Sequence, residues 1–471
     1  MGSHRLFFAG MLFVSDCEIV SPPCQKLHLL DALIAGVAWK GIVLEPTPKS
    51  TLEISAPPPP RIHSIDALRG FVMFTMIFVN DLAGAPKTIV PDWLVHFSDR
   101  HPEGSGMTFV DLVFPAFIFI VGMSLPFALG RRIAQGEPVW KIFGHVAIRT
   151  VSLLMIGILM VHETPASDRL GWSGELWCVL MYLAAIAAFG SFGPRRPTST
   201  PTHVTAARAL NLGLRVTGLA ALIWLAFAFR GDHGQRIVTL TPLHLDTDWY
   251  GILGLIGWAY LVASTVYLVF RGHRTALLGC MVLLLCLFAA DRRGLFEKCW
   301  LNQVVGIGET LGSQAAIAVG GLLLGSMLVA TDVTTLRSRL TFTGWFAAGC
   351  AGAALLLNPL YGISKNNATP PWCLWACAFT AGLWFLFYLI TDVRPVKILA
   401  RPLALAGQNV LLAYLISEML PGLLDVLHLG DWYGRLSEAH LASAIARSAF
   451  CGGLILLIAT GLNRVGFRLK L

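Results

Sequence analysis

The stretch that decides the fold is SIDALRGFVMFTMIFVNDLAGAP, residues 64–86, followed after a short loop by GMTFVDLVFPAFIFIVGMSLP, residues 106–126. Both segments are apolar and long enough to cross a bilayer, which takes about 20 residues. Four ionisable residues nevertheless lie within or beside them: Asp66, Arg69, Asp81 and Asp111. A charge at membrane depth costs several kcal/mol unless it is paired or hydrated, so these residues are candidates for function.

The composition is that of a membrane protein. Of the 471 residues 55% are hydrophobic and only 13% are charged, and the mean hydropathy is +0.68. Soluble globular proteins carry about 25% charged residues, so the chain is predicted to lie in a lipid bilayer. The net charge of +8 comes mostly from short loops between apolar runs, which indicates membrane topology and no nucleic-acid partner.

Apolar runs from residue 62 onward predict an all-α polytopic protein with 11 or 12 transmembrane helices in one bundle. The twelve predicted segments are 65–83, 108–130, 141–161, 174–192, 208–229, 249–270, 275–290, 312–331, 342–358, 373–391, 402–420 and 439–462. The seventh is short enough to be tilted or re-entrant. Residues 1–60 differ in composition and are expected to form a poorly ordered cytoplasmic extension before a transmembrane domain over 61–471.

The charges of the connecting loops alternate. Arg and Lys gather in every second loop, namely 130–141, 193–208, 271–274, 332–340, 392–401 and the C-terminal 463–471. The positive-inside rule assigns these loops, and with them both chain ends, to the cytoplasm. The loop that carries His96 and His101 then faces the other side. The clearest exception to the alternation is the 291–312 loop, which carries three basic residues.

His96 and His101 are the sharpest candidates for chemistry. A neutral imidazole accepts and returns a proton near neutral pH. A lone histidine in a loop is usually only solvated, but here two lie between membrane-embedded carboxylates. Their spacing is not a recognised zinc pattern and no HExxH motif occurs, so we predict no metal.

The carboxylates also have structural interpretations. Asp66 and Arg69 are spaced for an ion pair on one helix, and Asp111 could cap the helix that it begins. His145 and Arg149 lie one helical turn apart and are predicted to face a cytoplasmic vestibule. No Walker A, GxSxG or dinucleotide-binding motif is present.

The pattern SIDALRG…VND…WLVH…GMTFVDLVFPAFIFIVGMSLP resembles the heparan-alpha-glucosaminide N-acetyltransferase family and its bacterial relatives, which are multi-span acyltransferases. GILGLIGWAYLVA, SKNNATPPW and ALAGQNVLLAYLISEML are also similar to family segments. The resemblance implies transfer of an acetyl group from cytosolic acetyl-CoA to a sugar amine or hydroxyl across the membrane. It also implies a catalytic histidine in the first outer loop.

Two alignments of that histidine remain open. Counting from Trp93 favours His96, whereas counting back from DLVFP favours His101, and we prefer His96 narrowly. By the same resemblance Asn80 and Asp81 match a polar pair at the end of the first span, and Asp111 matches the aspartate of DLVFP.

The roles expected from this resemblance form an acyl-transfer site. The histidine would be the base, Asn80 would orient it or donate to the oxyanion, and Asp81 or Asp111 would hold its tautomer. The CoA phosphates would find their partners in Arg69, His145 and Arg149.

The expected partners are a sugar or glycan acceptor and the lipid bilayer, and a homodimer is left open. We expect a bacterial inner membrane, or a lysosomal-type membrane in a eukaryote. The rival hypothesis is a secondary transporter of a sugar or related solute, for which embedded charges are equally natural. Transporters often contain internal repeats, and we find no second copy of the DLVFP pattern.

Overall fold

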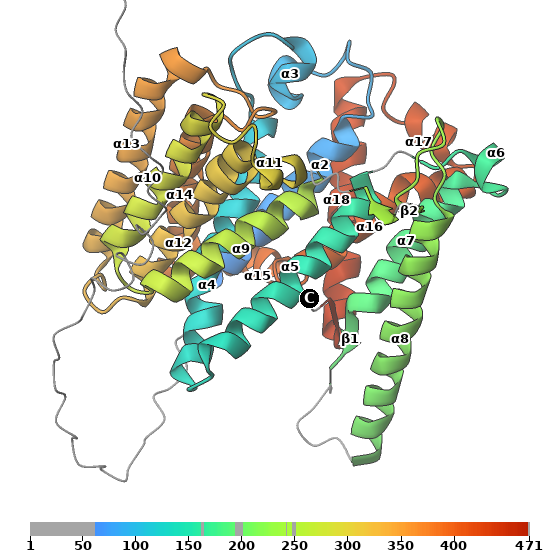
Figure 1. Ribbon diagram of the computed structural model, residues 1–471, viewed down its shortest axis with the longest axis horizontal. Helices are drawn as coiled ribbons and strands as arrows, with labels where there is room; N and C mark the ends of the chain where they lie inside the picture. Colours follow the sequence, from blue (N-terminus) through green and yellow to red (C-terminus); the bar gives the residue numbers. More distant parts are fainter. Residues whose placement is uncertain (1–61, 162–163, 194–200, 242, 247–250, 470–471) are drawn as a thin grey trace, which may run out of the picture. The chain divides into compact units, whose positions relative to one another are not determined.

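The computed structural model describes residues 62–161, 164–193, 201–241, 243–246 and 251–469, so the predicted extension over 1–60 lies outside the described residues. The described part is built from helices, as predicted (Figure 1). The longer helices are α2 (His63–Leu82), α4 (Val113–Ala134), α5 (Val139–Val161), α7 (Gly174–Phe189), α8 (Pro201–Ala228), α9 (Ile252–Phe270), α10 (Arg274–Asp291), α12 (Ala315–Val329), α13 (Leu336–Tyr361), α14 (Pro370–Tyr388), α15 (Lys397–Ala406), α16 (Val410–Val426) and α18 (Leu441–Arg464).

Short helices and strands occupy the connections. The helical turns are η1 (Asp92–Leu94), α3 (Phe97–Arg100), η2 (Val110–Leu112), α6 (Ser167–Leu170), α11 (Trp300–Val304), η3 (Ile307–Gln314), η4 (Leu389–Val393) and α17 (Gly430–Arg435). Two antiparallel pairs of three-residue strands complete the described part: β1 (Gly190–Phe192) with β4 (Phe467–Leu469), and β2 (Val238–Leu240) with β3 (Leu243–Leu245).

All twelve predicted segments contain helix, and within the described residues nine helices are long and apolar enough to span a membrane. The fold class is confirmed, but the number of straight spans is smaller than predicted. Helix α2 carries three charged residues, and α7 has only 16 residues. The predicted 402–420 span is wrong as one helix, because α15 and α16 meet at a 74° bend.

Close packing explains the bend between α15 and α16. A Cβ atom on Gly407 would lie 1.8 Å from the carbonyl oxygen of Asp66, and one on Gly70 would lie 2.1 Å from that of Leu403. The backbones of α2 and α15 therefore touch, which only glycine permits. Beyond the contact, the Asn409 side chain accepts a hydrogen bond from the backbone N–H of Leu469, so the chain turns there.

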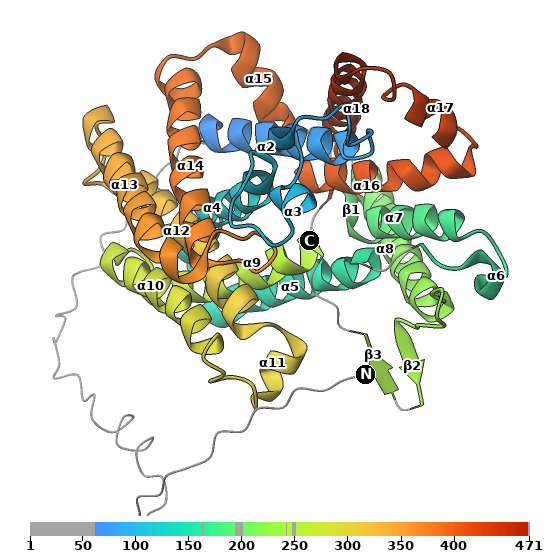
Figure 2. The same cartoon turned by 90° about the horizontal axis from the view of Figure 1, so that it is seen from above.

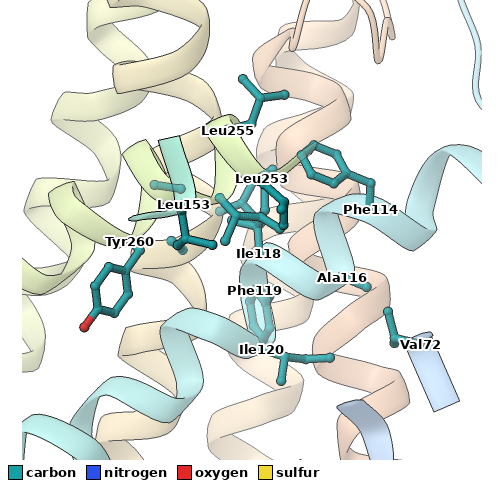
Figure 3. Close-up of a cluster of buried hydrophobic side chains, with 14 of the residues drawn as sticks. Val72, Phe114, Ala116, Ile118, Phe119, Ile120, Leu153, Leu253, Leu255 and Tyr260 are labelled. Carbon is teal, nitrogen blue, oxygen red and sulfur yellow. The ribbon is translucent and has the colours of Figure 1, made fainter. Parts of the chain in front are cut away.

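Helix α12 lies at the centre of its half of the bundle. It is apolar on every face. In an apolar 18-residue stretch of Ile307–Val329, the segment that ends with α12, 94% of the residues are buried. Two glycines at its contact with α4, Gly122 and Gly321, would each bring a Cβ within 2 Å of the opposite backbone. Figure 3 shows part of the core, where Ile118 of α4 lies next to Leu253 of α9.

Helices α8, α10 and α13 expose most of their apolar residues. In an apolar 18-residue stretch of each, only 17%, 17% and 22% of the residues are buried. Figure 2 shows α8 on one side of the bundle and α10 and α13 on the other. Exposed apolar helices at the periphery are what a bilayer would cover. In Figure 1, α3 and α17 lie at the upper end, whereas β1 lies toward the lower end, so the predicted outer and inner loops separate.

Candidate active site at the start of helix α4

Asp111 lies in η2, directly before α4, and is 1% exposed. Its Oδ2 accepts hydrogen bonds from two backbone N–H groups, those of Phe97 at 3.1 Å and Thr108 at 2.9 Å. Its Oδ1 lies 2.7 Å from Nδ1 of His96. The carboxylate therefore does more than cap a helix, because it ties the histidine loop to the beginning of the span.

His96 is the N-cap residue of the short helix α3, and its side chain is 31% exposed. A carboxylate accepts hydrogen bonds, so the Nδ1 atom that faces Asp111 carries the proton of this pair. The lone pair of a neutral imidazole then resides on Nε2. A partly exposed imidazole with its tautomer set by a buried carboxylate is the arrangement of a general base or nucleophile.

Lys365 joins this pair from a distant part of the chain. Its Nζ lies 3.2 Å from both Nδ1 and Nε2 of His96. Burial lowers the pKa of the Lys365 ammonium below its ordinary value, while the negative charges of Asp111 and Asp99 act in the opposite direction. Lys365 was not among the residues predicted for the site, although a lysine in a loop at the same end of the bundle as His96 was a readable signal.

His101 lies at the other end of α3, as its C-cap residue. Its ring packs against that of Phe97, with 4.9 Å between the centroids, and the residue is exposed. Of the two histidines, His96 is thus the one held by Asp111. Which of them is catalytic stays a prediction.

Asn80 and Asp81 belong to a second polar cluster, at the end of α2. Nδ2 of Asn80 donates to Oε1 of Glu418 at 3.3 Å. The carboxylate of Asp81 accepts from Nε of Arg447 at 3.1 Å and from the hydroxyl of Tyr433 at 2.7 Å. Between Asp81 and Asp111, the two candidates for orienting the histidine, Asp111 makes the contact.

This second cluster lines a cavity of about 600 Å³ between α2, α16, α17 and α18. Arg447 is 9% exposed, its guanidinium lies over the ring of Tyr433 at 4.7 Å, and it pairs with Asp81. Arg447 lies inside the last predicted span, where a charged residue indicates a functional position, but it was not among the predicted site residues. Glu418, paired with Asn80, and Asp425 add two further carboxylates to the lining.

Two of the three residues expected at acetyl-CoA line a different cavity, of about 500 Å³, beside the α15–α16 bend. Arg69 forms the predicted ion pair with Asp66 at 3.2 Å and also donates to the hydroxyl of Ser124 at 2.6 Å. Arg149 lies over the ring of Tyr260 at 4.7 Å.

His145 is exposed and is not among the residues that line this cavity, whereas Arg149 is, and the role of His145 at acetyl-CoA stays a prediction. The two residues share nearly the same face of α5 but lie about 6 Å apart along its axis, so one can line the cavity without the other.

The fold and the two polar clusters define a polytopic membrane protein in which a buried carboxylate, Asp111, pairs with a partly exposed histidine at one end of a span. Residues 61–242 match a family model described as "Domain of unknown function (DUF5009)". The human protein named heparan-alpha-glucosaminide N-acetyltransferase is 32% identical over 157 residues, which are 33% of this chain and 20% of the human protein. The mouse protein of that name is 29% identical over 104 residues, or 22% of this chain and 14% of the mouse protein.

These matches support a family relationship with that acetyltransferase. The aligned part of the chain spans only a fifth or less of the length of these curated relatives.

Proposed function

We propose that the protein is a membrane acetyltransferase that moves an acetyl group from cytosolic acetyl-CoA to a sugar amine or hydroxyl on the non-cytoplasmic side. The observation that carries the proposal is the 2.7 Å contact between Nδ1 of His96 and buried Asp111, which leaves the Nε2 lone pair for the reaction. The partial similarity to two acetyltransferases supports the same reaction class.

The proposed chemistry is a proton-coupled acyl transfer. The acceptor nitrogen or oxygen attacks the thioester carbonyl carbon while its proton passes to Nε2 of His96. The new C–N or C–O bond forms, the C–S bond breaks, and the imidazolium returns the proton to the departing thiolate of CoA. Asp111 holds the Nδ1 proton and stabilises the imidazolium, as the carboxylate of a catalytic triad does. The same geometry serves a stepwise route through acetyl-histidine, which single-turnover labelling distinguishes.

The cavity beside the α15–α16 bend is the proposed binding site for the phosphates of CoA. Arg69 and Arg149 supply two positive charges to one 500 Å³ cavity, although Asp66 neutralises part of the first. Guanidinium groups suit phosphate because they donate parallel hydrogen bonds. His145, the third residue predicted at the CoA phosphates, lies outside the lining of this cavity.

The cavity at the end of α2 is the proposed binding site for the sugar acceptor. Its lining combines the carboxylate of Glu418, the amide of Asn80 and the phenol of Tyr433. Sugar hydroxyls bind such groups by hydrogen bonds, and the ammonium of an amino sugar pairs with a carboxylate. Its volume of about 600 Å³ falls within the usual range for small-molecule sites.

One observation favours the rival hypothesis of a secondary transporter. The α15–α16 pair is a discontinuous helix with polar residues at its break, and transporters bind their substrates at such breaks. The two hypotheses make different predictions for Asp111 and His96, because transport needs no activated imidazole.

The test is acetyl transfer from labelled acetyl-CoA by the purified full chain in liposomes, with a panel of amino sugars and oligosaccharides. We expect labelled product with wild type and with His101→Ala, and none with His96→Ala. Product made equally by His96→Ala would remove the proposed base. Movement of unlabelled sugar across the bilayer without acetylation would establish the transporter instead.

A further inference from the structure

The position of Lys365 over the His96 ring is specific. An atom at 3.2 Å from both ring nitrogens lies on the plane that bisects the line between them. An approach within the ring plane would collide with the carbon between the nitrogens, so the ammonium lies out of that plane. It therefore leaves the in-plane lone pair of Nε2 accessible, with the ammonium nitrogen 3.2 Å from Nε2.

Lys365 is held there by a junction of two loops. The backbone N–H of Gly106 donates to the carbonyl oxygen of Ile363 at 2.9 Å, and the N–H of Ile363 donates to the hydroxyl of Ser105 at 2.7 Å. Gly362 ends α13 with φ +64°, a backbone conformation that favours glycine, and turns the chain toward this junction. Both hydrogen bonds join Ile363, two residues before Lys365, to the loop that carries His96, so they hold this segment next to the histidine.

Its charged surroundings do not neutralise Lys365 as a salt bridge would. The negative charges that act on it are those of Asp111 and Asp99. Asp111 directs its oxygens at His96 and at two backbone N–H groups, and Asp99 is exposed. A partly buried ammonium next to a proposed base, with its counter-charge committed elsewhere, is suited to a negative charge that appears during a reaction.

We propose that Lys365 is a catalytic residue whose ammonium stabilises the oxyanion formed when the thioester carbonyl is attacked beside Nε2 of His96. This inference rests on the proposed acetyl transfer. Attack converts the carbonyl to a tetrahedral alkoxide, and the ammonium donates a hydrogen bond to that oxygen without giving up its proton. When the C–S bond breaks, the electron pair leaves with sulfur and the carbonyl re-forms. Asn80, the residue first expected to donate, is instead bonded to Glu418.

The test compares Lys365→Met, Lys365→Ala and Lys365→Arg in the full-length protein in liposomes. We expect kcat to fall by about 10²- to 10³-fold in Lys365→Met, the usual loss for one oxyanion donor, with KM for acetyl-CoA unchanged. Guanidinium ion, far below denaturing concentrations, should restore part of the kcat of Lys365→Ala, because it supplies the missing N–H donors and is not itself acetylated readily. Lys87→Met is the matched control, since Lys87 is exposed on the same loop as His96, and it should keep wild-type kcat.

The outcomes distinguish the role of Lys365 from the proposed acetyl transfer. No acetyl transfer by wild type would overturn the proposed function itself. An active wild type with an unchanged Lys365→Met would overturn the role of Lys365 alone. Equal loss in all three variants, with no rescue by guanidinium and a lowered melting temperature, would make Lys365 a structural support of the loop and also overturn the proposal.

Discussion

Replacing Asp111 by Asn tests how the site sets the tautomer of His96. Oδ2 of Asp111 receives two backbone N–H groups, so an amide at this position must keep its oxygen there. In the flipped orientation, the NH2 group of the asparagine side chain would face the N–H groups of Phe97 and Thr108, so donors would face donors. The NH2 group therefore faces Nδ1 of His96, which must accept, and the imidazole proton moves to Nε2, where the lone pair is needed.

The expected loss is large and confined to chemistry. The equivalent change in a Ser-His-Asp triad lowers kcat about 10⁴-fold through the wrong tautomer, and we expect about 10³- to 10⁴-fold here. The shape and the two backbone hydrogen bonds are kept, so the free energy of unfolding should fall by only about 1–3 kcal/mol, the cost of weakening charge-assisted hydrogen bonds.

The assay measures kcat for acetyl transfer beside thermal unfolding of the same preparation. Asp111→Ala is the comparison variant, because it leaves the N–H groups of Phe97 and Thr108 without an acceptor and should destabilise the protein more than Asn does. A folded Asp111→Asn protein with kcat within tenfold of wild type would refute the tautomer argument.

Three further predictions follow from other parts of the structure. Arg149→Ala should raise KM for acetyl-CoA about 10- to 100-fold, the cost of one charged hydrogen bond, while His145→Ala on the same helix should not; equal effects would remove the proposed phosphate site. Gly407→Ala should lower the free energy of unfolding by about 1–3 kcal/mol, since its Cβ would overlap the backbone of α2, whereas Gly344→Ala, with open space around its Cβ, should be neutral or stabilising in thermal unfolding. Burial lowers the pKa of Lys365, so its ammonium loses its proton as the pH rises through that lowered value, and kcat should fall on the alkaline side. Lys365→Arg should extend activity to higher pH, because a guanidinium stays protonated. An unchanged alkaline limb in Lys365→Arg would show that another group titrates there.

The fold was predictable because the apolar runs reflect a physical requirement of the bilayer. Every predicted segment contains helix, since a chain in lipid must satisfy its backbone hydrogen bonds within each span. The bend at 407–409 was not predictable, because hydropathy does not register a glycine pressed against the backbone of another helix. Hydropathy indicates whether a segment lies in lipid, whereas this bend accompanies the packing of Gly407 against the backbone of α2.

The candidate site was predictable only where its parts are close in sequence. His96 and Asp111 are 15 residues apart and share a loop, so their association could be inferred. Lys365 lies 269 residues from His96, and Arg447 lies 366 residues from Asp81. Nothing in local pattern links such pairs, and each was visible only as an ionisable residue without an assigned role.

The junction between Gly106 and Ile363 has a consequence for biogenesis. His96 and Asp111 lie between α2 and α4 in the sequence, whereas Lys365 follows α13, so the lysine is synthesised long after the other two. A nascent chain that lacks its second half thus contains the base without the cation that our proposal requires for acyl transfer. If the proposal holds, incomplete chains do not transfer acetyl groups. Acetyltransferase activity would then indicate that the chain has been synthesised and inserted beyond α13.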